Sequence, residues 1–169
     1  MAHVHAFSEA NKQYAAAYPA EYTSLAMPPS RKVAVVTCMD ARLDPLSALG
    51  IKLGDAHVIR NAGGVGQDAL RSLVISQRLL GTREIAVFHH TDCGMLTFTS
   101  DQLRTIVKDQ TPAAGPLVDA IPTFHEFSDL DAAVKNDVKL LKESPLILDE
   151  TAITGWIHEV ETGKVRQIV

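Results

Sequence analysis

Short apolar runs alternate with longer helical patterns along this chain of 169 residues. The run Val33-Ala34-Val35-Val36 lies in a predicted strand over 32–37, and its β-branched, uninterrupted character is typical of strands buried in parallel sheets. Similar patterns predict strands over 56–60, 84–89, 153–159 and 165–169, and helical spacing predicts helices over 67–80, 101–108 and 129–142. This alternation predicts an α/β fold with a mainly parallel sheet flanked by helices.

Proline-rich segments and the chain ends interrupt this pattern. They are expected to form an N-terminal helical arm over 1–29, a turn at 44–45, loop or short helix over 111–128, and a C-terminal strand pair joined by a tight turn at 162–163. Within the arm, helix formers over 6–25 precede the breaker Pro28-Pro29. No repeat or linker divides the chain, so we expect a single domain over residues 1–169.

Composition and charge exclude several classes of protein. The chain is 46% hydrophobic and 21% charged, which is ordinary for a globular domain. Its formal net charge is -4 and its basic residues are scattered, so we expect no nucleic-acid partner. No apolar stretch reaches the roughly 18 residues of a membrane helix, and the N-terminus lacks the pattern of a signal peptide. We therefore expect no membrane association and a cytoplasmic location.

Three good metal ligands follow two of the predicted strands. Cys38 comes directly after the first strand, and His90-x-x-Cys93 follows the strand over 84–89. Parallel strands collect functional residues at their carboxyl ends. Two thiolates and an imidazole suit zinc and leave its fourth position open, as in catalytic sites. The alternative is that both cysteines are inert buried side chains and that His90 is a satisfied loop histidine.

Asp40 and Arg42 follow Cys38 in the same loop. Asp40 is close enough in sequence to become a fourth metal ligand or to accept a hydrogen bond from metal-bound water, and Arg42 could hold it ionised and oriented. His89 competes with His90 as a ligand. Adjacent strand residues point to opposite faces, and the spacing to the following cysteine favours His90, so His89 is interpreted as structural.

A glycine-rich segment over 61–66 lies between the two ligand-bearing regions. It lacks the patterns of phosphate-binding loops, so we interpret it as a close approach of the backbone to the active cleft. Apolar lining of that cleft would suit a small neutral substrate. Candidate lining residues are Met39, Ala62, Gly63, Val65 and Met95, and ordinary packing in the core explains the apolar side chains among them equally well.

Three motifs occur in order, namely Cys38-Met-Asp-Ala-Arg42, Arg60-Asn-Ala-Gly-Gly64 and His90-Thr-Asp-Cys93-Gly94. Together they resemble the β-carbonic anhydrase family, in its short microbial form, over residues 30–100. The tail over 154–163 resembles the closing strands of that family. One departure is that the first motif has no equivalent of the glutamine that longer, plant-like members place near the substrate.

The resemblance implies a zinc enzyme. Cys38, His90 and Cys93 would bind one Zn²⁺ per chain, and Asp40 would leave the zinc to pair with Arg42 in the open state. Zinc lowers the pKa of water enough to supply hydroxide near neutral pH, and hydroxide attacks an electrophilic carbon. The resemblance also implies a homodimer or homotetramer in which the N-terminal arm lies on the partner.

Carbon dioxide, hydrated reversibly to bicarbonate, is the substrate that the resemblance implies first. Relatives in the same family hydrolyse carbonyl sulfide or carbon disulfide on the same zinc site. The motifs do not separate these linear molecules, because discrimination depends on the width and apolarity of the pocket. A third possibility is a non-catalytic zinc protein in which Asp40 closes the fourth position, and Arg42 counts against it because it offers Asp40 another partner.

Overall fold

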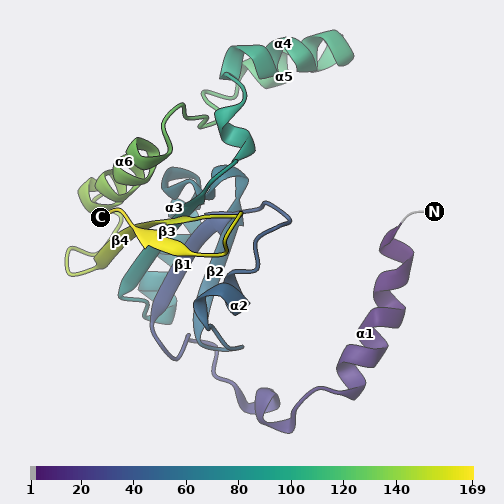
Figure 1. Cartoon of the computed structure of the whole chain (residues 1–169), viewed down its shortest axis with the longest axis vertical. Coiled ribbons are helices and arrows are strands. Elements are labelled where there is room, and N and C mark those ends of the chain that lie inside the picture. Colours follow the sequence, from purple (N-terminus) through teal and green to yellow (C-terminus); the bar gives the residue numbers. More distant parts are fainter. Residues whose placement is uncertain (1–2) are drawn as a thin grey trace.

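The computed structural model describes residues 3–169, which form a five-stranded sheet with helices packed against it (Figure 1). The strand order is β2-β1-β3-β4-β5, with β1 (Val33–Cys38), β2 (Ala56–Asn61), β3 (Glu84–His90), β4 (Ala152–His158) and β5 (Val165–Gln167). β1 is parallel to β2 and β3, β4 is parallel to β3, and β5 is antiparallel to β4. The predicted sheet and C-terminal strand pair are therefore confirmed.

The α-helices of the described residues are α1 (Phe7–Ala16), α2 (Pro45–Leu49), α3 (Gly66–Leu80), α4 (Ser100–Gln110), α5 (Gly115–Asp119) and α6 (Leu130–Glu143). The helices predicted over 67–80, 101–108 and 129–142 correspond to α3, α4 and α6 within two residues at each end. The segment expected as loop or short helix contains α5. None of these helices is long and apolar enough to cross a membrane.

α2 forms where only a turn was expected. The side chain of Asp44 accepts a hydrogen bond from the backbone N–H of Ser47, and Pro45 occupies the first turn, where its missing N–H removes no helical bond. The helix ends at Gly50, which adopts a left-handed φ of 60°. Five residues are too few to display helical periodicity, so the pattern of apolar residues gave no signal.

The hydrophobic core lies between one face of the sheet and the helices α3 and α6. Leu73 of α3 and Leu141 of α6 are fully buried there. Alternate strand residues pack against them, namely Ala34, Val36, Ile85, Val87 and Ile153. Because side chains alternate along a strand, His90 of β3 points to the opposite face. His89, by the same alternation, lies on the core face beside α6, where it pairs with Asp137.

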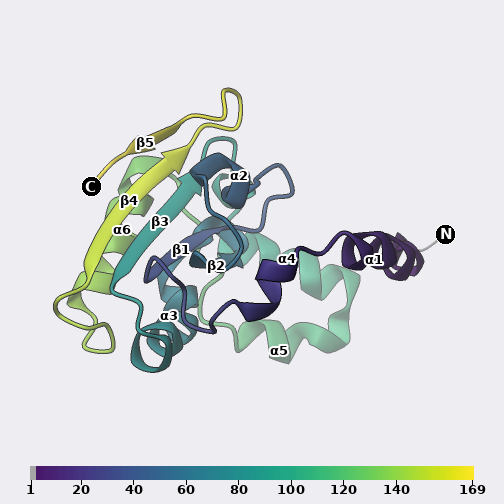
Figure 2. The same cartoon turned by 90° about the horizontal axis from the view of Figure 1, so that it is seen from below.

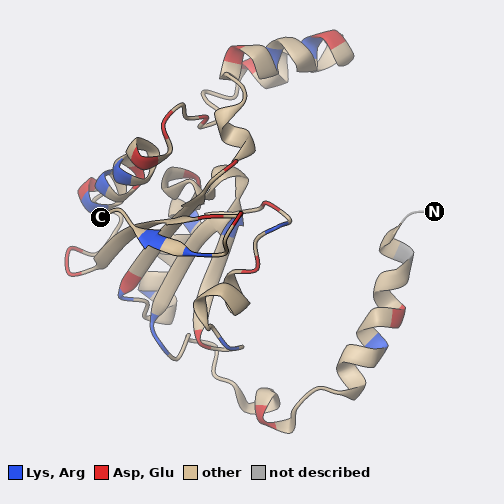
Figure 3. Ribbon diagram, viewed as in Figure 1, with Lys and Arg blue, Asp and Glu red and all other residues tan. Residues whose placement is uncertain are grey.

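Two segments project from this body in both views (Figures 1 and 2). One is the N-terminal arm, in which α1 has no buried residue and Pro19 separates it from a short 3₁₀ helix over Ala20–Ser24. The helix formers expected over 6–25 therefore fall mainly in two separate helices. The other is the pair α4 and α5, and α4 also has no buried residue. Figure 3 shows acidic and basic residues scattered over the ribbon, with mainly uncharged residues in the arm.

Candidate metal centre

The three expected metal ligands come together at the carboxyl ends of β1 and β3. Cys38 is the last residue of β1, His90 is the last residue of β3, and Cys93 lies in the loop that follows. All three are buried, and the two sulfur atoms and an imidazole nitrogen lie within 4.8 Å of one another. Neighbouring parallel strands end at the same edge of the sheet, which is why residues far apart in the sequence meet here.

The imidazole of His90 presents a free nitrogen to this cluster. Its Nδ1 lies 2.8 Å from the carbonyl oxygen of Thr91. A carbonyl only accepts, so Nδ1 carries a proton, and in the neutral imidazole Nε2 then keeps its lone pair. Nε2 is buried and has no hydrogen-bond partner within the described residues. Burying an unpartnered polar atom is costly, and a metal ion at this position would satisfy it.

The side chains of Cys38 and Cys93 shift each other's pKa in opposite directions. The neighbouring Cys93 thiol lowers the pKa of Cys38 to about 4, and the backbone N–H of Gly63 also donates to Cys38 Sγ at 3.3 Å. The hydrogen bond to Cys38 and burial raise the pKa of Cys93. The site thus favours the thiolate form of Cys38, which is the form that binds a metal ion. The donor set of two sulfurs and one imidazole fits zinc.

The glycine segment lets the backbone pass between the ligand-bearing strands. Gly64 adopts a left-handed φ of 73°, and a Cβ at this position would lie 2.6 Å from the carbonyl oxygen of Phe88 and 3.0 Å from the nitrogen of Cys38. The Asn61 side chain closes the loop by bonding both the N–H and the carbonyl of Val65. The backbone of this segment therefore lies close to both strands that carry the candidate ligands.

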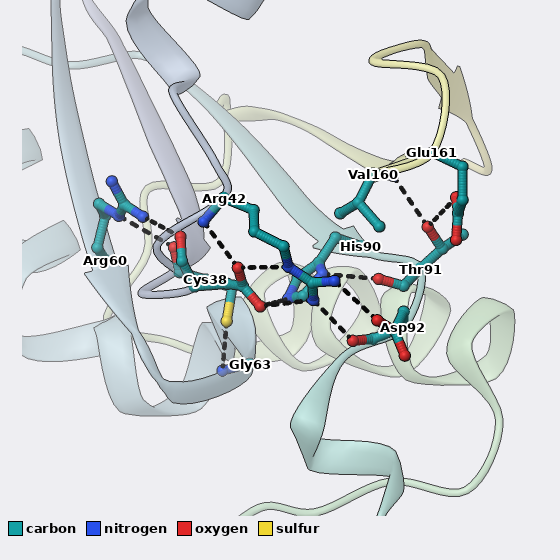
Figure 4. A network of polar contacts seen from close by, with 10 residues as sticks. Cys38, Arg42, Arg60, Gly63, His90, Thr91, Asp92, Val160 and Glu161 are labelled. Atoms are coloured by element: carbon teal, nitrogen blue, oxygen red, sulfur yellow. Dashed lines mark hydrogen bonds and ion pairs between the residues drawn. The ribbon is translucent and has the colours of Figure 1, made fainter.

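Asp40 lies beside the cluster but is turned toward Arg42. Arg42 Nε donates to Asp40 Oδ1 at 3.0 Å, and Nη2 donates to Oδ2 at 2.8 Å (Figure 4). Hydrogen bonds from the Arg42 side chain and backbone hold the pKa of Asp40 well below its usual range. Asp40 Oδ2 lies 3.9 Å from His90 Nε2, so the carboxylate is adjacent to the candidate metal position. The pairing of Arg42 with an ionised Asp40 agrees with the expectation from the sequence.

Two arginine contacts were not anticipated from the sequence. Arg60 Nε donates to the carbonyl of Cys38 at 3.0 Å, and its Nη2 donates to the carbonyl of Asp40 at 2.7 Å (Figure 4). Arg60 therefore fixes the backbone of the loop that carries the ligand and the carboxylate. Arg42 also reaches Asp92, with 2.7 Å between Nη1 and Oδ2. Each contact joins residues that are far apart in the sequence and that only the pairing of the strands brings together.

A cavity of about 400 Å³ opens onto the cluster. Of the sequence-predicted lining residues, Met39, Ala62, Gly63 and Met95 border it, together with Cys38, Asp40 and Cys93. Phe98, Leu103 and Phe124 add apolar surface that the sequence did not single out. A larger cavity of about 630 Å³ between Leu96 and Asn136 contains none of the candidate metal ligands.

Val65 and His89 lie elsewhere. Val65 borders a separate cavity of about 240 Å³ together with His89 and Asp137, and it is absent from the lining of the cavity beside the cluster. The reason is that Val65 follows the tight glycine turn and leads into α3. His89 Nε2 lies 2.8 Å from Asp137 Oδ2 of α6, on the core side of the sheet. This geometry agrees with the structural interpretation of His89.

Comparisons with known proteins identify the family. Residues 33–165 match the family model described as carbonic anhydrase. Beta-carbonic anhydrase 1 of Mycobacterium tuberculosis is 48% identical over 147 residues, covering 85% of this chain and 86% of that protein. The chain belongs to the β-carbonic anhydrase family. A solved carbonic anhydrase from Glaciozyma antarctica is 56% identical, with a TM-score of 0.91 and 95% of each chain covered.

This family member also has relatives that act on a sulfur compound. The carbon disulfide hydrolase of Saccharolobus solfataricus is 38% identical over 161 residues, which cover 83% of this chain and 79% of that protein. The family resemblance drawn from the three motifs is confirmed, and so is the expectation of an enzyme of the carbonate dehydratase type.

Proposed function

We propose that this chain binds one zinc ion through Cys38, His90 and Cys93 and hydrates carbon dioxide reversibly to bicarbonate. The observation that carries the proposal is the convergence of two sulfur donors with the unpartnered Nε2 of His90. A zinc ion held by these residues would lower the pKa of a bound water molecule, so that this water could act as the nucleophile near neutral pH. With Asp40 engaged by Arg42, three protein ligands leave a fourth position for that water.

Asp40 has the role of a fixed hydrogen-bond acceptor in this proposal. Because Arg42 keeps Asp40 ionised, its carboxylate can accept a hydrogen bond but has no proton with which to donate one. It could therefore accept a hydrogen bond from the O–H of a metal-bound water and so orient that water toward the substrate. Arg60 supports this arrangement because it holds the backbone carbonyl of Asp40.

The cavity supports a small, neutral substrate. Its side chains near the cluster are mainly apolar, including Met95, Phe98 and Leu103. An apolar site of this kind admits a linear molecule without a charge and offers little to a charged metabolite. The apolar lining also accommodates sulfur, and the similarity to a carbon disulfide hydrolase favours hydrolysis of carbonyl sulfide or carbon disulfide as the second candidate.

The deciding experiment is a side-by-side measurement of turnover on one zinc-loaded preparation. Carbon dioxide hydration is followed by proton release, and hydrolysis of carbonyl sulfide and carbon disulfide is followed by sulfide release. Fast proton release with little sulfide would support the proposed carbonic anhydrase. Dominant sulfide release would establish the second candidate. No turnover of any of the three substrates would favour a non-catalytic zinc protein in which Asp40 closes the site.

The N-terminal arm is proposed to lie on a partner subunit of a homodimer or homotetramer. Its described part exposes large apolar side chains, with Phe7 66%, Tyr14 57% and Met27 80% exposed. Such surface is unusual on a free monomer and is typical of an interface. Residues 1 and 2 of the arm lie outside the described residues. Sedimentation of Phe7→Lys and Tyr14→Lys variants tests the proposal, because a monomer is expected only if the arm mediates assembly. The cytoplasmic location stays a prediction.

A further inference from the structure

Arg42 is held by two aspartates at once. Its Nε and Nη2 atoms donate to the carboxylate of Asp40. Its opposite edge reaches Asp92, where Nη1 donates to Oδ2 at 2.7 Å and Nη2 donates to the backbone carbonyl at 3.0 Å. A guanidinium has five N–H groups, and the four hydrogen bonds to the two aspartates can each use a different one. Figure 4 shows Arg42 reaching Asp92, with dashed lines between the two residues.

The second anchor matters because Arg42 is not confined by packing. Its side chain is 48% exposed, whereas that of Asp40 is only 19% exposed. A long, half-exposed arginine samples many rotamers, and each additional contact reduces the loss of entropy in pairing with Asp40. Asp92 is 72% exposed and lies at the rim, so it contacts the arginine from the solvent side.

Asp92 is itself placed by the C-terminal strand pair. Thr91 N–H donates to the carbonyl of His158 at 3.0 Å, and Thr91 Oγ1 donates to Glu161 at 2.8 Å. The N–H of Val160 in turn donates to Thr91 Oγ1 at 3.0 Å. These bonds tie the loop after β3 to the turn between β4 and β5 (Figure 4). Asp92 follows directly, with a left-handed φ of 52°.

The geometry points to Asp92 as a positioning residue that holds Arg42 in the orientation that keeps Asp40 turned away from the metal position. Asp92 touches neither the substrate cavity nor the candidate donor atoms, so it acts through Arg42. Without it, Arg42 would release Asp40 more readily, and Asp40 would compete for the fourth metal position. This inference rests on the proposed function.

The test uses Asp92→Asn and Asp92→Gly, because asparagine and glycine adopt a left-handed backbone readily whereas alanine would add strain. Asparagine keeps an oxygen acceptor without the charge, and glycine removes the side chain. Each protein is loaded with cobalt(II) and titrated with azide, which enters the fourth position only when Asp40 is away. The visible absorption spectrum reports azide binding, and elemental analysis reports cobalt content.

We expect cobalt content to stay the same and the dissociation constant of azide to rise by about two- to fivefold in Asp92→Gly, the range that an exposed ion pair supplies. Asp92→Asn should show a smaller rise. The matched control is Asp131→Asn, which breaks another exposed pair, Asp131–Arg166, at 2.7 Å. It should leave azide binding unchanged.

Equal azide affinity in the parent and both Asp92 variants would overturn the positioning role while leaving the proposed function intact. Loss of cobalt from Asp92→Asn would also overturn it, because Asp92 would then support the ligand loop rather than Arg42. If the cobalt-loaded parent shows no spectral response to azide at all, the fourth position is closed, and the proposed function itself fails.

Discussion

Replacing Gly64 by alanine would place a methyl group between the two strands that carry the metal ligands. The new Cβ would lie 2.6 Å from the carbonyl oxygen of Phe88 in β3 and 3.0 Å from the nitrogen of Cys38 in β1. Both are backbone atoms, so neither can move aside as a flexible side chain would. We expect the two strand ends to separate and the protein to lose stability.

The magnitude follows from two costs. The left-handed φ of 73° costs an alanine about 1–2 kcal/mol. Overpacking against immobile atoms adds about 1–3 kcal/mol. For a chain of this size each kcal/mol lowers the melting temperature by roughly 2–4 °C, so a total cost of about 2–5 kcal/mol should lower that of Gly64→Ala by roughly 4–20 °C.

Gly81→Ala is the matched control. Gly81 has a similar φ of 77°, but its added Cβ would meet nothing within 4 Å, so only the backbone cost applies. Thermal unfolding followed by circular dichroism, at equal protein concentration and metal content, compares the two variants. If Gly64→Ala melts no lower than Gly81→Ala, the close approach of strands is not what requires glycine, and the account of this turn is wrong.

Three further predictions concern the ligands, the carboxylate and pH. Cys93→Ala should reduce zinc, measured by elemental analysis, from about one ion per chain to almost none, and wild-type zinc content would contradict the ligand assignment. Asp40→Ala keeps all three donors, so zinc should remain while turnover falls roughly a hundredfold or more. Undiminished turnover would remove Asp40 from the mechanism. Glu126 accepts hydrogen bonds from the side chain and N–H of Ser100, both at 2.6 Å, and these lower its pKa. Because the folded pKa is lowered, the stabilisation is complete above the unfolded pKa and is lost as pH falls through the folded value. The melting temperature of Glu126→Gln should therefore lie below that of the parent near neutral pH and approach it in acid, whereas a gap independent of pH would contradict the assignment.

The sequence by itself determined the strands of the sheet and the candidate donors. The valine-rich run from Val33 to Val36 has a local signature, because short runs rich in β-branched residues are typical of strands buried in a parallel sheet. Cys38 and His90 were predictable as neighbours because parallel strands end at a common edge. The same local reasoning found Asp40 and Arg42, which are only two residues apart.

Only the tertiary structure decided which other groups surround these donors. Arg60 reaches the loop after β1 because it pairs in register with Thr37, and register between separate strands leaves no trace in residue spacing. The contact from Arg42 to Asp92 spans 50 residues, and Asp92 adopts a left-handed backbone that no residue pattern signalled. Leu103 joins the cavity through the placement of α4. Local patterns report the period of one element, whereas these contacts arise from how separate elements are placed against one another.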